Sequence, residues 1–283
     1  MLIITTATEL KEVLVQFKEK KIGFVPTMGA LHEGHISLIK KSKKISDITV
    51  CSIFVNPTQF NDQKDFEKYP ITTDKDISLL ELAHCDIVFL PAVQEIYPEG
   101  YTQKTNYQLG YLEEILEGKY RPGHFQGVCQ VVDRLLHFVM PNYLIMGAKD
   151  YQQCMVIQHL LKSNTTISTV QLVIAPTIRE SSGLAKSSRN MRLSSQDILN
   201  AITIYQSLQY INLHLQKGKT APIIEKAVSI LYNSGFEKVD YVAVADANTL
   251  ELVEEWDGEK SVVILAAAFL NGIRLIDNII MTK

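Results

Sequence analysis

The feature of this sequence that most limits its fold is a regular alternation of short, continuously apolar runs with longer amphipathic stretches. The short runs are rich in Val, Ile and Phe, which is typical of strands buried on both faces. They are residues 22–25, 48–55, 86–90, 143–146 and 170–175. Between them, apolar residues spaced three and four apart from Val128 to Val139 predict a helix. This alternation predicts an α/β fold with a parallel sheet covered by helices on both faces.

The character of the sequence changes after Ile178, where a polar, serine-rich stretch begins. Ser194 then has the position of an N-cap for a long helix, and a second helix runs to about Gly235. Three apolar strands are predicted after it, at residues 238–245, 261–270 and 274–281. A chain of 283 residues is long enough for two domains. We therefore expect a Rossmann-like α/β domain over residues 1–178 and a smaller α+β lid domain over residues 179–283.

Charge and hydropathy argue against two classes of partner. The net charge is −3 and the pI is about 6.2, so no overall basic field exists to bind a nucleic-acid backbone. The longest apolar run, residues 262–270, is far shorter than the roughly 20 residues that cross a bilayer. The N-terminus lacks the pattern of a secretory signal, and the four cysteines are widely spaced in apolar stretches. We expect a cytoplasmic protein that binds neither nucleic acid nor membrane.

Polar segments follow four of the predicted strands, at the edge where open α/β sheets bind ligands. These segments are residues 26–35, 56–60, 147–150 and 179–192. Because the carboxyl ends of parallel strands share one edge of a sheet, we expect the four segments to converge on a single site.

The first of these segments contains the motif His32-Glu33-Gly34-His35. The dinucleotide motif GxGxxG is absent from the chain, and the histidine spacing differs from the HExxH of zinc proteases. A helix that begins here places both imidazoles on one side and offers N–H groups to a phosphate, while Gly34 lets a nucleotide approach the backbone. Two imidazoles beside a phosphate stabilise the charge that develops during attack at phosphorus. The alternative is a pair of exposed histidines at a helix start.

The later segments add cationic, hydroxyl and amide groups. Lys149 directly follows a strand and either reaches a polyphosphate or is an ordinary solvated lysine. Residues 186–190, Lys-Ser-Ser-Arg-Asn, suit a phosphate clamp or a polar linker between domains. Asp150 and Gln153 match a helix capping box as well as a ligand site. Together with the histidine motif, these groups indicate an enzyme that uses ATP to activate a small carboxylate.

Six motifs run through nearly the whole chain. They are FVPTMGALHEGH (24–35), IFVNPTQF (53–60), RPGHFQGV (121–128), KDYQQ (149–153), GLAKSSRN (183–190) and RLIDN (274–278). In order and spacing they resemble the pantothenate synthetase (pantoate–β-alanine ligase) family of the HxGH nucleotidylyl transferase superfamily.

The resemblance implies the ATP-dependent condensation of (R)-pantoate with β-alanine to form pantothenate. In the family's reaction, the pantoate carboxylate attacks the α-phosphorus of ATP and releases pyrophosphate. The β-alanine amine then attacks the enzyme-bound pantoyl adenylate and releases AMP. The resemblance also implies Mg²⁺ as a cofactor and a homodimeric assembly, and it leaves the metal ligands unassigned.

The resemblance assigns roles to individual residues, with His35 in the position of a proton donor. The expected catalytic residues are His35, His32, Lys149 and Arg189. The expected substrate-binding residues are Gln59, Gln153 and Asn56, of which Gln59 would also serve the β-alanine site. The expected ATP-binding residues are Met28, Gly29, Ala30, Leu31, His32, Glu33, Gly34, His35, Gly147, Ala148, Lys149, Asp150, Ile178, Lys186, Ser187, Ser188 and Arg189.

The chain departs from the family pattern at three positions. Lys186 stands where methionine or leucine is common, Ala148 where glutamate is common, and Ile71 where arginine often follows Tyr69-Pro70. None of these departures removes an expected catalytic group. The polar segment from Asn61 to Thr73 follows the substrate loop, and we predict that it acts as a lid.

Two other functions are compatible with parts of the sequence. One is a different HxGH nucleotidylyl transferase, which would keep the nucleotide in its product. The other is a non-catalytic nucleotide-binding or regulatory module that retained the fold. The set of six polar site residues, His32, His35, Gln59, Lys149, Gln153 and Arg189, argues against a non-catalytic module.

Overall fold

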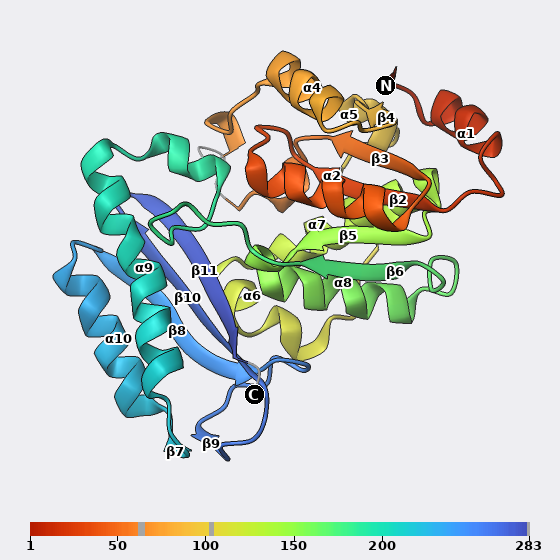
Figure 1. Cartoon of the computed structure of the whole chain (residues 1–283). Helices are drawn as coiled ribbons and strands as arrows, with labels where there is room; N and C mark the ends of the chain where they lie inside the picture. The colour runs from red at the N-terminus through yellow and green to blue at the C-terminus, as the bar shows by residue number, and fades with distance from the viewer. Residues whose placement is uncertain (62–65, 102–104, 282–283) are drawn as a thin grey trace. The chain divides into compact units, whose positions relative to one another are not determined.

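The computed structural model describes residues 1–61, 66–101 and 105–281 (Figure 1). The chain divides into two compact units. The first unit comprises residues 1–147 and 156–176, and the second comprises residues 148–155 and 177–283. The division at residue 176 is close to the predicted domain boundary after residue 178. The short segment 148–155, which the sequence assigned to the first domain, groups with the second unit.

A parallel sheet forms the centre of the first unit. Its strands are β1 (Leu2–Ile4), β2 (Ile22–Thr27), β3 (Ile48–Ile53), β4 (Ile87–Phe89), β5 (Tyr143–Gly147) and β6 (Gln171–Ala175). Their order is β1-β4-β3-β2-β5-β6, and every neighbouring pair is parallel. All five predicted strands of this sheet are confirmed. β1 was not predicted, because a strand of three residues with two exposed side chains is too short to show a pattern.

Helices with apolar faces cover this sheet. The helices are α1 (Ala7–Val15), α2 (Glu33–Ile45), α4 (Thr73–Leu82), α5 (Val93–Ile96), α6 (Leu116–Tyr120) and α7 (His124–Val139), with the 3-10 turns η1 (Pro57–Gln59) and η2 (Gly110–Glu113). α8 (Tyr151–Ser163) begins in the second unit and continues in the first. α2 packs on β2, β3 and β5, in front of the sheet in Figure 1, and buries Leu38 and Ile39 against Val25 and Cys51. The predicted apolar stripe lies in α7, where its residues are buried.

The second unit combines two long helices with an antiparallel sheet. Its elements are η3 (Ala148–Asp150), η4 (Ser188–Arg192), α9 (Ser195–His214), β7 (Gly218–Lys219), α10 (Ala221–Asn233), β8 (Lys238–Asp246), β9 (Glu255–Trp256), β10 (Val262–Leu270) and β11 (Ile273–Met281). The sheet order is β11-β10-β8, and α9 and α10 pack on it through a shared apolar core. The predicted α+β architecture is therefore confirmed, and Ser194 is the N-cap of α9 as predicted.

The helices and the cysteines can be compared with two of the expectations from the sequence. Among the helices of the described residues, none combines the length and apolar character of a membrane span. All four cysteines are buried free thiols, which confirms their predicted place in the core. Burial raises the pKa of the Cys85 thiol to about 12 and also raises the pKa values of Cys51, Cys129 and Cys154. These thiols therefore stay protonated and uncharged near neutral pH.

Candidate active site

The strand order creates a topological switch point between β2 and β5. From β2 the chain continues to β3 and β4 on one side, while β5 and β6 lie on the other side. Open α/β sheets bind ligands beyond the carboxyl ends of the strands at such a point. The strands that precede the four predicted polar segments are consecutive neighbours, in the order β3-β2-β5-β6. The histidine motif follows β2, and the segment with Gln59 follows β3.

A tight turn joins β2 to α2, and a buried carboxylate stabilises its shape. Gly29 and Ala30 have φ values of +80° and +49°, a region that alanine rarely adopts. The carboxylate of Asp76 in α4 accepts hydrogen bonds from the N–H groups of Ala30 (2.9 Å) and Leu31 (2.8 Å). The Thr72 hydroxyl donates to the same carboxylate, and Asp76 is only 1% exposed. The backbone that leads into the histidine motif is therefore held by a residue that the sequence did not single out.

His32 and His35 cap the first turn of α2 through their Nδ1 atoms. Nδ1 of His32 accepts from the N–H of Gly34 at 3.1 Å, and Nδ1 of His35 accepts from the N–H of His32 at 3.3 Å. The two ring centroids are 4.1 Å apart, so the imidazoles lie side by side as their spacing predicted. A ring nitrogen that accepts a hydrogen bond carries no proton, so each neutral ring has its proton on Nε2. Both rings therefore have a defined hydrogen-bond donor at Nε2.

The loop after β3 brings Gln59 beside the turn after β2. The Nε2 of Gln59 lies 2.8 Å from the sulfur of Met28. The buried amide of Asn56 donates to Oε1 of Gln59 (3.1 Å) and to the carbonyl of Gly127 (3.2 Å). The Asn56 oxygen accepts from the hydroxyl of Tyr97 at 2.8 Å, and burial raises the pKa of Tyr97 so that it remains a donor. Both amide protons of Asn56 are thus used within the chain, and one of them orients Gln59.

The backbone of Gln59 is held by residues from the start of α7 and the end of α6. Nδ1 of His124 lies 2.7 Å from the Gln59 carbonyl, and Nη2 of Arg121 donates to the same carbonyl at 3.4 Å. Nη1 of Arg121 lies 3.0 Å from Nε2 of His124, which makes Nε2 the acceptor and places the proton on Nδ1. The buried carboxylate of Glu117 lies 3.6 Å from the Arg121 guanidinium. Arg121 and His124 lie in the motif at residues 121–128, for which the sequence predicted no separate role.

Of the four nucleotide-binding residues predicted at residues 147–150, Gly147 ends β5 in the first unit, and Ala148, Lys149 and Asp150 form the turn η3 in the second. Ala148 is buried there, and the Lys149 ammonium lies 3.8 Å from a carboxylate oxygen of Asp150. Asp150 directly precedes α8, and Gln153 is the third residue of that helix. These are the N-cap and N3 positions of a capping box. The capping alternative therefore stays open for both residues, beside the predicted ATP contact of Asp150 and the predicted substrate contact of Gln153.

The predicted phosphate clamp begins in a short hairpin. The N–H of Lys186 donates to the carbonyl of Ile178 at 2.9 Å. The ammonium of Lys186 lies 2.9 Å from the carboxylate of Glu180, so this departure from the family pattern forms an ion pair across the hairpin. Ser187 then caps η4 by accepting from the N–H of Arg189 at 3.3 Å. The residues from Lys186 to Arg189 therefore form one ordered turn.

The predicted lid is only partly covered by the described residues, because residues 62–65 lie outside them. At its start, the ring of Phe60 contacts those of Phe66 and Tyr69, with centroid distances of 5.3 and 5.7 Å. Asn61 donates to the Pro122 carbonyl, and Ile71 is 79% exposed. Motion of this segment stays a prediction.

The sequence profile of the family described as pantoate-beta-alanine ligase matches residues 2–280. The chain belongs to this family. A pantothenate synthetase from Cytophaga hutchinsonii is 42% identical to it, over 99% of each chain. A pantothenate synthetase of known crystal structure, from Thermus thermophilus, has 35% sequence identity to this chain, with a TM-score of 0.92 over 100% of both chains. A pantoate-beta-alanine ligase from Francisella tularensis, complexed with beta-gamma ATP and beta-alanine, is 37% identical, with a TM-score of 0.83 over 100% of this chain and 98% of that one.

Membership in the pantoate–β-alanine ligase family confirms the resemblance found in the motifs and the Rossmann-like fold. Three site contributions were not anticipated: the carboxylate of Asp76, the pair Arg121 and His124, and the amide of Asn278, which donates to the carbonyls of Ala148 and Lys149 in η3. One signal for the first was available in the sequence. Asp76 lies four residues before Leu80 and seven before Ala83, so a carboxylate occupies the buried face of α4.

Proposed function

We propose that this chain catalyses the ATP-dependent condensation of (R)-pantoate with β-alanine to form pantothenate, with release of AMP and pyrophosphate. The observation that carries the proposal is the family match over residues 2–280. The paired histidines at the helix start, with their protons on Nε2, support it because they suit a phosphate that gains charge during reaction.

In the proposed first step, a carboxylate oxygen of pantoate attacks the α-phosphorus of ATP. The bond from that phosphorus to the pyrophosphate oxygen breaks, and a pantoyl adenylate forms. We assign the Nε2–H groups of His32 and His35 to the reacting phosphate, with His35 as proton donor. Lys149 and Arg189 offset the remaining phosphate charge, because charge-assisted hydrogen bonds are the strong ones. The residues from Met28 to His35, Gly147 to Asp150, Lys186 to Arg189, and Ile178 complete the proposed ATP site.

In the proposed second step, the β-alanine amine attacks the acyl carbon of the adenylate. The bond from that carbon to the phosphate oxygen breaks, AMP leaves with the bonding electron pair, and the amine releases its proton to solvent. Gln59 and Gln153 supply the donors and acceptors that hold pantoate, and Gln59 also orients β-alanine. Asn56 acts on the substrate through Gln59, since its own amide protons bind within the chain. The predicted lid segment, from Asn61 to Thr73, excludes water, which otherwise competes with the amine.

We propose that Mg²⁺ enters the site with ATP. In the described part of the chain, no group of three or more His, Cys, Asp and Glu side chains is arranged to hold a metal ion. Mg²⁺ usually binds through one or two carboxylates together with substrate phosphates, so it does not need such a group. Asp150, an exposed carboxylate in η3, fits this requirement. Bound Mg²⁺ would neutralise part of the triphosphate charge.

We also propose a division of labour and an assembly. The first domain, residues 1–178, binds ATP and pantoate, and the second, residues 179–283, acts as a lid. The chain works as a cytoplasmic homodimer. Sedimentation measurements test the assembly, and a molar mass equal to the single-chain value of 31.9 kDa at all concentrations would contradict it.

Incubation of the protein with ATP, pantoate and β-alanine tests the function directly. The proposal expects pantothenate, AMP and pyrophosphate in equal amounts, together with pantoate-dependent exchange between ATP and labelled pyrophosphate. A stable nucleotidylated product would instead indicate a different HxGH transferase. Binding of ATP without any pantoate-dependent exchange would indicate a non-catalytic module.

A further inference from the structure

Two consecutive buried residues of β11, Asp277 and Asn278, contact both segments of the second unit to which phosphate binding is assigned. They are 2% and 4% exposed, and the N–H of Asn278 donates to the Asp277 carboxylate at 2.8 Å. Polar groups buried this deeply are costly unless they are hydrogen-bonded. Their partners therefore indicate what the two side chains hold in place.

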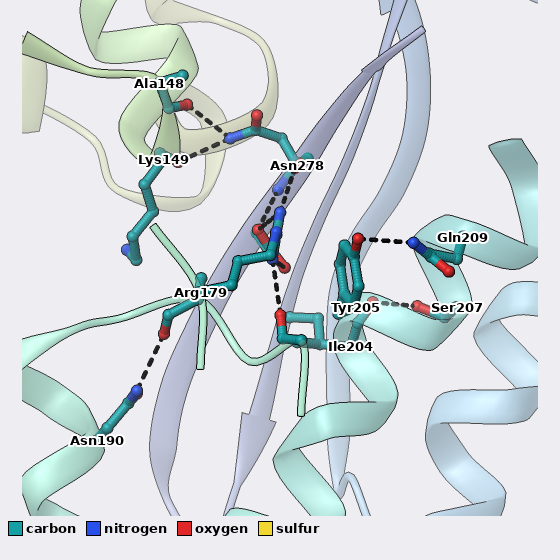
Figure 2. Close-up of polar contacts among 12 residues, drawn as sticks. Ala148, Lys149, Arg179, Asn190, Ile204, Tyr205, Ser207, Gln209 and Asn278 are labelled. Atoms are coloured by element: carbon teal, nitrogen blue, oxygen red, sulfur yellow. Dashed lines mark hydrogen bonds and ion pairs between the residues drawn. The ribbon is translucent and has the colours of Figure 1, made fainter. Parts of the chain in front are cut away.

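The side chain of Asn278 binds the turn that carries Lys149. Its Nδ2 donates to the carbonyl of Ala148 at 2.9 Å and to the carbonyl of Lys149 at 2.8 Å (Figure 2). A single amide group thus restrains two successive peptide units of η3. The ammonium end of Lys149 extends away from Asn278 in Figure 2, so these bonds fix the backbone from which the side chain projects.

The side chain of Asp277 binds the base of the hairpin at residues 178–186. Its two oxygens accept hydrogen bonds from the two terminal nitrogens of Arg179, at 2.6 and 3.0 Å. The same guanidinium donates to the carbonyl of Gly183 at 3.1 Å and lies over the ring of Tyr205, 3.9 Å from its centroid. Burial raises the pKa of Asp277, and the Arg179 guanidinium opposes that shift. Bidentate pairing sets both the distance and the plane of the guanidinium.

This hairpin leads directly into the predicted phosphate clamp. Arg179 pairs with Ala185 in an antiparallel bridge. The side chain of Asn190 donates to the carbonyl of Ala185 at 3.0 Å, which ties η4 back to the hairpin. The position of Arg179 therefore determines where the turn with Arg189 begins.

We propose that Asp277 and Asn278 are positioning residues that hold the Lys149 turn and the Arg179 hairpin at one fixed spacing, so that Lys149 and Arg189 act on the same nucleotide. Because successive side chains of a strand point to opposite faces, one rigid strand reaches a segment on each side. The proposal rests on the proposed function for the assignment of Lys149 and Arg189 to phosphate.

Variants of the two residues test the proposal against a matched control. In Asn278→Ala and Asp277→Asn we expect kcat for pantoate-dependent ATP–pyrophosphate exchange to fall about tenfold or more, with the KM for pantoate changed by less than about threefold. The control, Thr220→Val, removes another buried hydrogen bond of the same unit, from the Thr220 hydroxyl to the Val253 carbonyl at 2.7 Å. We expect it to keep kcat near the wild-type value. Thermal melting identifies the temperature at which all variants are folded.

A folded Asn278→Ala or Asp277→Asn protein with near-wild-type kcat would overturn the proposal. Should Asn278→Ala fail to fold, Asn278→Ser serves for the same comparison. Amide hydrogen exchange without substrates separates this inference from the proposed function. Faster exchange confined to residues 148–152 in Asn278→Ala and to residues 178–190 in Asp277→Asn supports positioning, and unchanged exchange there refutes it. A wild-type protein that shows no pantoate-dependent ATP–pyrophosphate exchange would refute the proposed function. Amide hydrogen exchange alone would then decide whether Asp277 and Asn278 position these segments.

Discussion

At the scale of single residues, the histidine motif depends on a carboxylate 41 residues away from His35 in sequence. Asp76 accepts the N–H groups of Ala30 and Leu31, the two residues that directly precede His32. Ala30 has a positive φ of +49°, a conformation that costs energy for any residue with a Cβ. The hydrogen bonds to Asp76 compensate for that cost. The turn that leads into the histidine motif thus combines a strained backbone with one buried acceptor.

Replacing this acceptor tests its importance. Asp76→Asn keeps the shape of the side chain but turns one acceptor oxygen into a donor that faces an N–H group. We expect a loss of about 1–3 kcal/mol in the free energy of unfolding, and about a tenfold loss of kcat in pyrophosphate exchange. Chemical denaturation and exchange kinetics measure the two effects. Asp74→Asn makes the same charge change at an exposed site of the same helix and should alter neither. Equal behaviour of the two variants would contradict the role of Asp76.

Removing an imidazole tests the assigned proton donor. His35→Ala deletes the Nε2–H group proposed to face the reacting phosphate. We expect the rate of adenylylation to fall at least about tenfold, or about 1.4 kcal/mol of barrier, with the fold unchanged. Pyrophosphate exchange and circular dichroism provide the measurements. The control variant His137→Ala, at an exposed position of α7, should catalyse pyrophosphate exchange at the wild-type rate. Near-normal exchange by His35→Ala would rule out the assigned role.

At the scale of elements, α9 shows how local sequence sets a boundary. Ser194 accepts a hydrogen bond from the N–H of Asp197, and the Asp197 carboxylate accepts from both the hydroxyl and the N–H of Ser194, at 2.7 and 3.1 Å. The bond from the Ser194 side chain is the main cause that lowers the pKa of Asp197 below its usual 3.8, and the amide of Asn271 adds to it. The carboxylate form is therefore the one that stabilises this helix start.

The lowered pKa predicts a pH dependence of stability. A carboxyl group whose pKa is lower in the folded state stabilises the fold above about pH 3.8, and this contribution disappears as the pH falls through the folded pKa. Asp197→Asn removes the contribution at every pH. We expect the melting temperature of the variant to lie furthest below that of the wild type at about pH 6 and the gap to narrow toward about pH 3. Thermal melts across this pH range measure it, and a gap that does not depend on pH would contradict the assigned cause.

Most elements were predictable from the sequence, for a local reason. The runs at 22–25, 48–55 and 143–146 became β2, β3 and β5 because a strand buried on both faces must be continuously apolar. β1 escaped prediction because three residues, two of them exposed, show no strand pattern; only its pairing with β4, Leu2 to Ile87, reveals it. The segment 148–155 groups with the second unit rather than with the first. The bonds that hold its first two residues, Ala148 and Lys149, come from Asn278, 130 and 129 residues later in the sequence.

At the scale of the whole molecule, nucleotide binding couples to stability. A ligand that binds only the folded state stabilises it by about 2.7 kcal/mol at one hundred times its Kd. For a chain of this size that corresponds to a rise of about 4–5 °C in melting temperature. We expect ATP to produce such a rise, measured by differential scanning calorimetry. The rise should be smaller for Lys149→Ala at the same ATP concentration, and an unchanged melting temperature of the wild type at saturating ATP would contradict nucleotide binding.

The sequence by itself determined the fold class and predicted which groups react. Periodic burial specifies strands and helices locally, and the motif from Met28 to His35 predicts nucleotide chemistry because a helix start with two imidazoles suits a phosphate. The tertiary structure decided how those groups are held. Asp76, His124 and Asn278 bind backbone groups that are distant in sequence, and hydrogen bonds of this kind leave no periodic trace in a chain. Such contacts depend on which elements the fold brings together, so only the three-dimensional arrangement reveals them.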